Sequence, residues 1–188
     1  MAGTQEHFRR RSRAGRVLAA AALSALLAGC ASAPPQPAAP VPASISTAAL
    51  IASIRAAGAQ EGSIVNVAPL RPPGVQALLD QVKADEIAGH WHLAAQALDQ
   101  ALALDPHAPD VLQDRAEVAV ALARWAQAET LALRSWALGP RVGALCARNW
   151  QTVLEMRQIT GTGAGTGGGV ARARAARDAC RVSGPPQM

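Results

Sequence analysis

The chain has 188 residues, a formal net charge of +5 and a sequence pI near 10.4. It contains no Tyr, one Phe and four Trp, which excludes an aromatic-rich core and leaves Ala, Leu and Val to build one. Small and unbranched residues of this sort favour closely packed helices.

The N-terminal segment has the pattern of a secretion signal. Arginines at 9, 10, 11, 13 and 16 precede a 13-residue apolar run, Val17–Gly29. A helix that short does not cross a hydrocarbon core, which needs roughly 20 residues. Without residues 1–29 the net charge falls from +5 to +1, so the high pI belongs to the signal. We therefore expect an exported protein that does not bind nucleic acid.

The apolar run ends in Leu27-Ala28-Gly29-Cys30, which resembles the lipobox of bacterial lipoproteins. The resemblance implies that Cys30 carries a diacylglyceryl group and becomes the N-terminus after cleavage. Ala31, in place of Asp, resembles the sorting pattern for the outer membrane of a Gram-negative host, with the protein facing the periplasm. The alternative is an ordinary cleavage site followed by an incidental cysteine.

Residues 31–43 contain five prolines and no charge. With Cys30 they form a predicted linker, 30–43, that stays extended at about 3.1 Å per residue and holds the domain up to about 40 Å from the membrane surface. The next segment, 44–73, is predicted to hold a short helix over 48–57 that Gly58 ends, and an extended stretch over 64–67.

Two helices follow with a clear apolar pattern. Val75, Leu78, Leu79 and Val82 recur at helical spacing in a helix that Gly89 ends. A second helix runs over 91–104 and stops before a proline at 106. The two predict a helical hairpin.

When the sequence is shifted by the spacing between Trp91 and Trp125, part of the chain aligns with itself. This is the pattern of a structural repeat. The superposed pairs are Trp91 and Trp125, Ala94 and Ala128, Leu104 and Leu138, and Pro106 and Pro140. We interpret the tryptophans as core residues of the hairpins rather than as a ligand site, because a large aromatic at a repeating position contributes mainly buried area.

This period resembles that of the tetratricopeptide repeat (TPR), a helix-turn-helix unit that stacks into a superhelix. Positions that match the repeat's turn glycine, small residues and closing proline are Gly89, Ala94, Ala101 and Pro106 in the first unit, and Ala116, Ala128, Ser135 and Pro140 in the second. The resemblance implies an all-α fold of TPR-like hairpins stacked as a short right-handed solenoid over 74–182. The units are 75–106, 109–140 and a degenerate 142–181, and 183–188 form a tail.

The third unit contains two cysteines separated by one repeat period, Cys146 and Cys180. They lie near the start of one predicted helix and the end of its antiparallel partner, where a disulfide is possible. In an oxidising envelope compartment such a bond stabilises the fold by on the order of 3 to 4 kcal/mol. Two buried free thiols are the alternative.

Other motifs carry little chemistry. Residues 163–168 contain a formal G-x-G-x-x-G, but no strand-helix-strand unit surrounds it, so we interpret it as a linker. His90 and His92 point to different sides of a helix, and His107 has no partner by spacing, so no metal site is predicted. We predict no cofactor and no enzymatic activity.

Charge is unevenly divided in the mature chain: residues 31–123 carry a net −5 and residues 124–188 a net +6. Such a distribution favours an acidic partner surface or weak head-to-tail self-association, with a solvated arginine face as the alternative. TPR lipoproteins are known to serve outer-membrane protein assembly, pilus assembly, or control of peptidoglycan synthases and hydrolases. The resemblance therefore implies a lipid-anchored adaptor that binds envelope proteins or peptide segments. A self-associating structural protein, or an enzyme with an unrecognised site, is the alternative.

Overall fold

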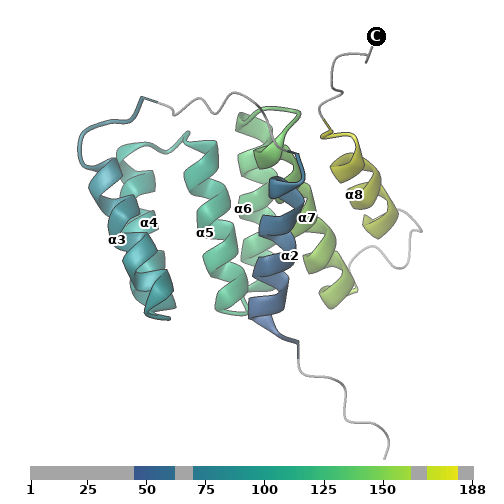
Figure 1. Ribbon diagram of the computed structural model, residues 1–188, viewed down its shortest axis with the longest axis horizontal. Coiled ribbons are helices and arrows are strands. Elements are labelled where there is room, and N and C mark those ends of the chain that lie inside the picture. Colours follow the sequence, from purple (N-terminus) through teal and green to yellow (C-terminus); the bar gives the residue numbers. More distant parts are fainter. Residues whose placement is uncertain (1–44, 62–69, 162–168, 182–188) are drawn as a thin grey trace, which may run out of the picture. The chain divides into compact units, whose positions relative to one another are not determined.

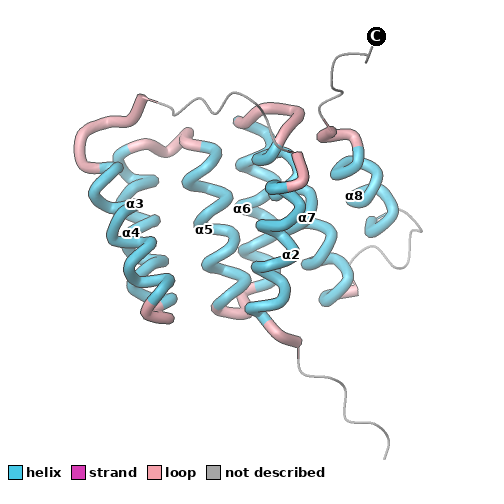
Figure 2. The backbone as a smooth tube through the Cα atoms, viewed as in Figure 1, coloured by secondary structure: helices cyan, strands magenta, loops and turns pink. Residues whose placement is uncertain are grey.

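A computed structural model describes residues 45–61, 70–161 and 169–181, all within one compact unit, Ile45–Met188. The predicted signal, Cys30, the linker, the extended stretch 64–67, the glycine motif 163–168 and the tail lie outside these residues. The described part is helix and loop without a strand (Figures 1 and 2). Its helices are α2 (Thr47–Ala59), α3 (Val75–Ile87), α4 (Trp91–Leu104), α5 (Pro109–Ala121), α6 (Trp125–Leu138), α7 (Ala144–Thr160) and α8 (Gly169–Asp178).

The all-α prediction is confirmed, and the helices follow one another as three hairpins, α3–α4, α5–α6 and α7–α8. Each helix from α3 to α7 packs on the next in the chain. Within the described ranges, no helix is both long and apolar enough to cross a membrane.

The first two hairpins share the same turn. Gly89 and Ala123, which are one repeat period apart, both have positive φ angles, 74° and 54°. The following amides, of His90 and Arg124, each donate 2.8 Å hydrogen bonds to carbonyls five residues back. The left-handed conformation favours glycine. The second unit adopts it with alanine, so the repeat extends to backbone conformation at a position where the residue types differ.

The residues that superpose in the sequence repeat differ in how deeply their side chains are buried. The small side chains of Ala94, Ala101, Ala128 and Ser135 are fully buried, and this lets neighbouring helices approach closely. Trp91 and Trp125 are half-buried, and Trp91 packs against both the core of the first hairpin and the core shared by α2, α5, α6 and α7. Pro106 and Pro140 are exposed beyond the ends of α4 and α6, as expected of residues that only end a helix.

The third hairpin is held by a disulfide between Cys146 and Cys180, whose Cα atoms are 5.6 Å apart. Trp136 and Trp150 pack against these cysteines and meet edge to face, with ring centroids 5.2 Å apart. The amide of Gly143 also donates a 2.7 Å hydrogen bond to the Cys180 carbonyl. The short, polar α8 is therefore fixed at its C-terminal end.

Helix α2 lies on the first helices of the second and third hairpins, α5 and α7 (Figure 1). Its N-terminus is capped by the Ser46 hydroxyl, which accepts a hydrogen bond from the Ala49 amide. Ile51 and Ile54 are buried in the same core as Met156. The sequence predicted that Gly58 ends this helix. The prediction is wrong, because Gly58 is a buried residue inside the helix. A docked α2 covers part of the face that the first helices would otherwise present.

Candidate functional site

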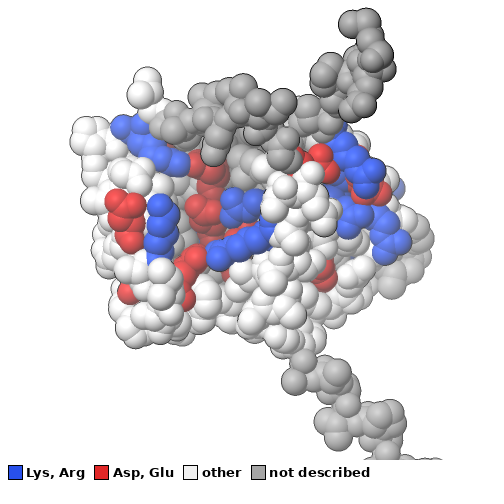
Figure 3. Space-filling model, viewed as in Figure 1, with Lys and Arg blue, Asp and Glu red and all other residues white. Residues whose placement is uncertain are grey.

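A groove opens between α2 and α3. Among the described helices, the backbone of α3 approaches only that of α4, whereas α2 packs on α5 and α7. A space therefore remains between α2 and α3. This α2–α3 groove encloses about 570 Å³. It is lined by Arg55, Gly58, Ala59, Arg71, Gln76, Leu79, Val82, Lys83, Glu86, Asp114, Ala144 and Arg148. Figure 3 shows basic and acidic side chains gathered on this face of the molecule.

The carboxylate of Glu117, on α5, joins α2 and α7 on one side of the groove. Its side chain is fully buried. It accepts hydrogen bonds from Arg55 Nε on α2 and Arg148 Nε on α7, both at 2.8 Å, and from Gln113 Nε2 at 3.1 Å. A buried carboxylate requires such partners, because an unpaired charge in this position would cost several kcal/mol. Glu117 therefore fixes the positions of two guanidinium groups.

Each of these arginines also contacts a second carboxylate. Arg55 Nη2 lies 2.8 Å from Glu86 Oε2, and Arg148 Nη2 lies 2.7 Å from Asp114 Oδ1. Burial opposes the charged form of both arginines, but the hydrogen bonds and charges of their carboxylate partners outweigh it and raise the pKa of each. Burial raises the pKa of Asp114 to about 6, against the attraction of Arg148.

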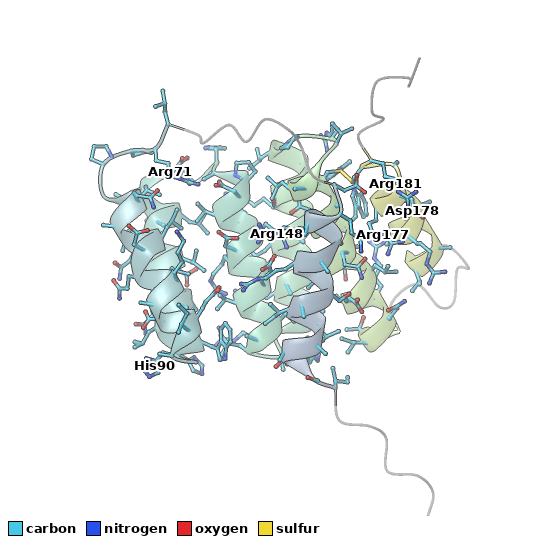
Figure 4. The ribbon with its side chains drawn as sticks, viewed as in Figure 1. Arg71, His90, Arg148, Arg177, Asp178 and Arg181 are labelled. Atoms are coloured by element: carbon cyan, nitrogen blue, oxygen red, sulfur yellow. A yellow bond between two sulfur atoms is a disulfide. The ribbon has the colours of Figure 1, made fainter. Side chains whose placement is uncertain are left out.

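Gly58 permits this arrangement. A Cβ atom at this position would lie 2.7 Å from Arg148 Cγ, which is too short for a real contact, and 3.1 Å from the Ala144 carbonyl oxygen, which is tighter than most real contacts. The glycine therefore serves close approach of α2 to α7. The Arg148 side chain, labelled beside α2 in Figure 4, lies against this glycine and donates hydrogen bonds to Asp114 and Glu117.

A second, smaller pocket of about 240 Å³ lies between α2, α7 and α8. Arg177 Nη1 donates a 2.8 Å hydrogen bond to Gln151 Oε1 there, and Arg181 is 3.9 Å from Glu61. The hydrogen bond from Arg177 and the positive charges of Arg177, Arg181 and Arg174 lower the pKa of Asp178. These internal pairs balance the charges of the pocket.

The histidines are not brought together into a site. His90 lies 3.7 Å from Asp85 at the start of α4, and His92 lines the same shallow apolar pocket as His90. His107 is exposed after α4. Within the described ranges no three His, Cys, Asp or Glu residues are grouped to hold a metal ion.

The charged residues of the groove were not among those that the sequence singled out. One signal was present in the sequence: Gln113 and Glu117 are spaced four apart, which places them on one face of a helix. The structure buries both side chains fully. Their partners, Arg55 and Arg148, are far apart in the sequence, so no local pattern links them. The lining contains no Ser, Cys or His, and its chemistry is that of charge and apolar contact.

The geometry defines an all-α domain of packed helical hairpins with a charged groove. No protein-family model and no curated protein matches the chain. A solved structure that it resembles is the globular C-terminal domain of LpoP from P. aeruginosa. The two are 29% identical, with a TM-score of 0.50, over 60% of this chain and all of that one. The helical fold is thus shared with a known domain, whereas membership of the TPR family stays a prediction.

Proposed function

We propose that the protein is a lipid-anchored adaptor of the outer membrane that faces the periplasm and binds a partner protein through the α2–α3 groove. The observation that carries this proposal is the groove itself, which has an apolar floor at Leu79 and Val82 and charged side chains around it. A groove that combines charged side chains with an apolar base suits recognition of a peptide or helix.

The likeness to the LpoP domain supports an envelope role and favours the peptidoglycan machinery among the processes that TPR lipoproteins serve. The predicted lipid anchor at Cys30 and the proline-rich linker are consistent with it, because a tethered domain would reach a partner some distance from the membrane. A binding role rather than catalysis is also favoured by the groove lining, which combines fixed ion pairs with apolar side chains.

Site-specific photo-crosslinking in the native cells tests the proposal. A photoreactive residue replaces Gln76, an exposed side chain in the groove, or Gln127, an exposed glutamine on α6 outside it. We expect Gln76 to capture an envelope protein of the peptidoglycan machinery and Gln127 to capture none, as read by mass spectrometry. Capture of only a second copy of this chain would favour a self-associating structural protein. The same proteins at both positions, or none, would overturn the proposal.

A further inference from the structure

The two arginines beside Glu117 have hydrogen-bonding capacity left over. A guanidinium has five N–H groups in a rigid fork. Arg55 and Arg148 each use Nε and Nη2 on the carboxylates described above. Neither Nη1 makes a hydrogen bond to any residue that the structure describes, and neither is a buried atom without a partner. Both Nη1 groups are therefore available to a ligand in the groove.

The lining of the groove is richer in cations than in carboxylates. Arg55, Arg71, Lys83 and Arg148 line it, against Glu86 and Asp114, while Glu117, Asp110 and Asp80 pair with these cations from beside the lining. Arg71, at the N-terminal side of α3, is held by an ion pair with Asp110 (Figure 4). Lys83 has a side chain that is 72% exposed, and its Nζ is 3.6 Å from Asp80. Lys83 thus supplies a movable charge beside arginines that are already fixed.

Fixed guanidinium groups suit recognition of carboxylates. Because Glu117, Glu86 and Asp114 hold the arginine side chains in place, little side-chain entropy remains to be lost on binding. The Arg148 side chain is only 24% exposed and lies within the groove, out of reach of a flat anionic surface such as a membrane. In an extended peptide segment, apolar residues beside the carboxylate would contact Leu79 and Val82, which line the groove.

We propose that the α2–α3 groove takes an acidic peptide segment of the partner, whose carboxylate is bound by the Nη1 groups of Arg55 and Arg148 and by the ammonium of Lys83. The proposal rests on the proposed function, since it assumes that the groove binds a partner protein, and it adds the chemistry by which that partner is chosen.

Peptide binding by the purified full-length protein tests this assignment through fluorescence anisotropy. The probes are fluorescein-labelled (Glu-Gly)5, (Gln-Gly)5 and (Lys-Gly)5. We expect the glutamate peptide to bind with the highest affinity and Lys83→Glu to weaken it about tenfold at low salt, because charge reversal adds repulsion. Arg172→Glu, at an exposed arginine of α8 that makes no ion pair with the described residues, changes the net charge equally and should alter the affinity less than twofold.

The outcomes separate this proposal from the adaptor function. Equal binding of the three peptides, or equal effects of Lys83→Glu and Arg172→Glu, would overturn the acidic-segment assignment. If Gln76 still captured an envelope protein in cells, the adaptor function would stand without it. Loss of glutamate-peptide binding in Lys83→Glu alone, with an unchanged circular dichroism spectrum, would support the assignment whether or not the cellular partner had been captured.

Discussion

Helix α5 meets its neighbours through different chemistry on its two sides. Toward the first hairpin it presents Val111 and Val118, which belong to one apolar core with Leu98 of α4, and Arg115, which forms an ion pair with Asp99 at the margin of that core. Toward α2 and α7 it adds a charge network to an apolar core: Gln113, Asp114 and Glu117 are hydrogen-bonded to arginines and to a threonine, beside Ala119 and Val120, which pack with residues of α2 and α7. Apolar burial stabilises a fold without selecting partners, whereas a buried ion pair adds little net stability. We therefore expect the residues that determine partner binding on the polar side of α5.

The largest expected effect is on the apolar side. Leu98→Ala removes a fully buried side chain and leaves a cavity, and we expect it to lower the free energy of unfolding by about 3 kcal/mol. Urea denaturation measures the change. Leu93→Ala, on the same helix but at a side chain 46% exposed, should cost less than about 1 kcal/mol. Similar losses in the two variants would mean that α4 is not packed as described.

A smaller effect is expected on the polar side. Glu117→Gln keeps the shape of the side chain but removes the anion shared by Arg55 and Arg148, which retain Glu86 and Asp114. Because those second partners remain, we expect a loss of about 2 kcal/mol, below the full cost of an unpaired buried charge.

A matched control for Glu117→Gln is Glu129→Gln, which breaks the ion pair with Arg157 at a site where both side chains are 20% exposed. Because this pair is only partly buried, whereas Glu117 is fully buried, the expected loss is smaller, at about 1 kcal/mol. If Glu129→Gln, on α6, cost as much as Glu117→Gln in urea denaturation, the full burial of Glu117 would not explain the effect of its substitution.

The contrast between the repeated packing positions and the charge network explains which parts of the structure could be predicted from the sequence. Helix α4 begins and ends as predicted, and α6 repeats it one period later, because the Trp, Ala and Pro positions that set these boundaries recur with the stacking of the hairpins. Packing of each unit on the next imposes the same small residues at the same places, and such a period is visible in one sequence.

The groove could not be predicted in this way. The arginines that pair with Glu117 come from α2 and α7, and their carboxylates from α3 and α5, so the network depends on tertiary contacts alone. Gly58 was interpreted as a helix end, whereas it serves close approach to Arg148. The division into an acidic and a basic half also overstates the charge separation, because Asp114 and Glu117 pair with Arg148 across it.

The smallest effect concerns the pH dependence of stability at Asp114. Burial raises its pKa from 3.8 to about 6, with Arg148 opposing and with Glu117 and Asp110, on the same helix, reinforcing the shift. Between these two pH values the folded state binds the proton more tightly than the unfolded state does, so this carboxyl stabilises the fold as pH falls from 6 toward 4 and loses that contribution as pH rises.

The measurement compares wild type with Asp114→Asn by urea denaturation at pH 7.0, 5.5 and 4.5. We expect the wild type to gain stability relative to the variant as pH falls, by less than the shift alone implies, because the side chain is 36% exposed and solvent screens it. Ordinary ion-paired carboxylates, such as Asp178 with its pKa lowered from 3.8, lose their stabilising contribution mainly below the pH range measured. Any remaining contribution is the same in wild type and variant and cancels when the two are compared. A constant difference across the three pH values would mean that Asp114 is more fully solvated than its place under α2 indicates, and the polar side of α5 would then be open to water before any partner bound.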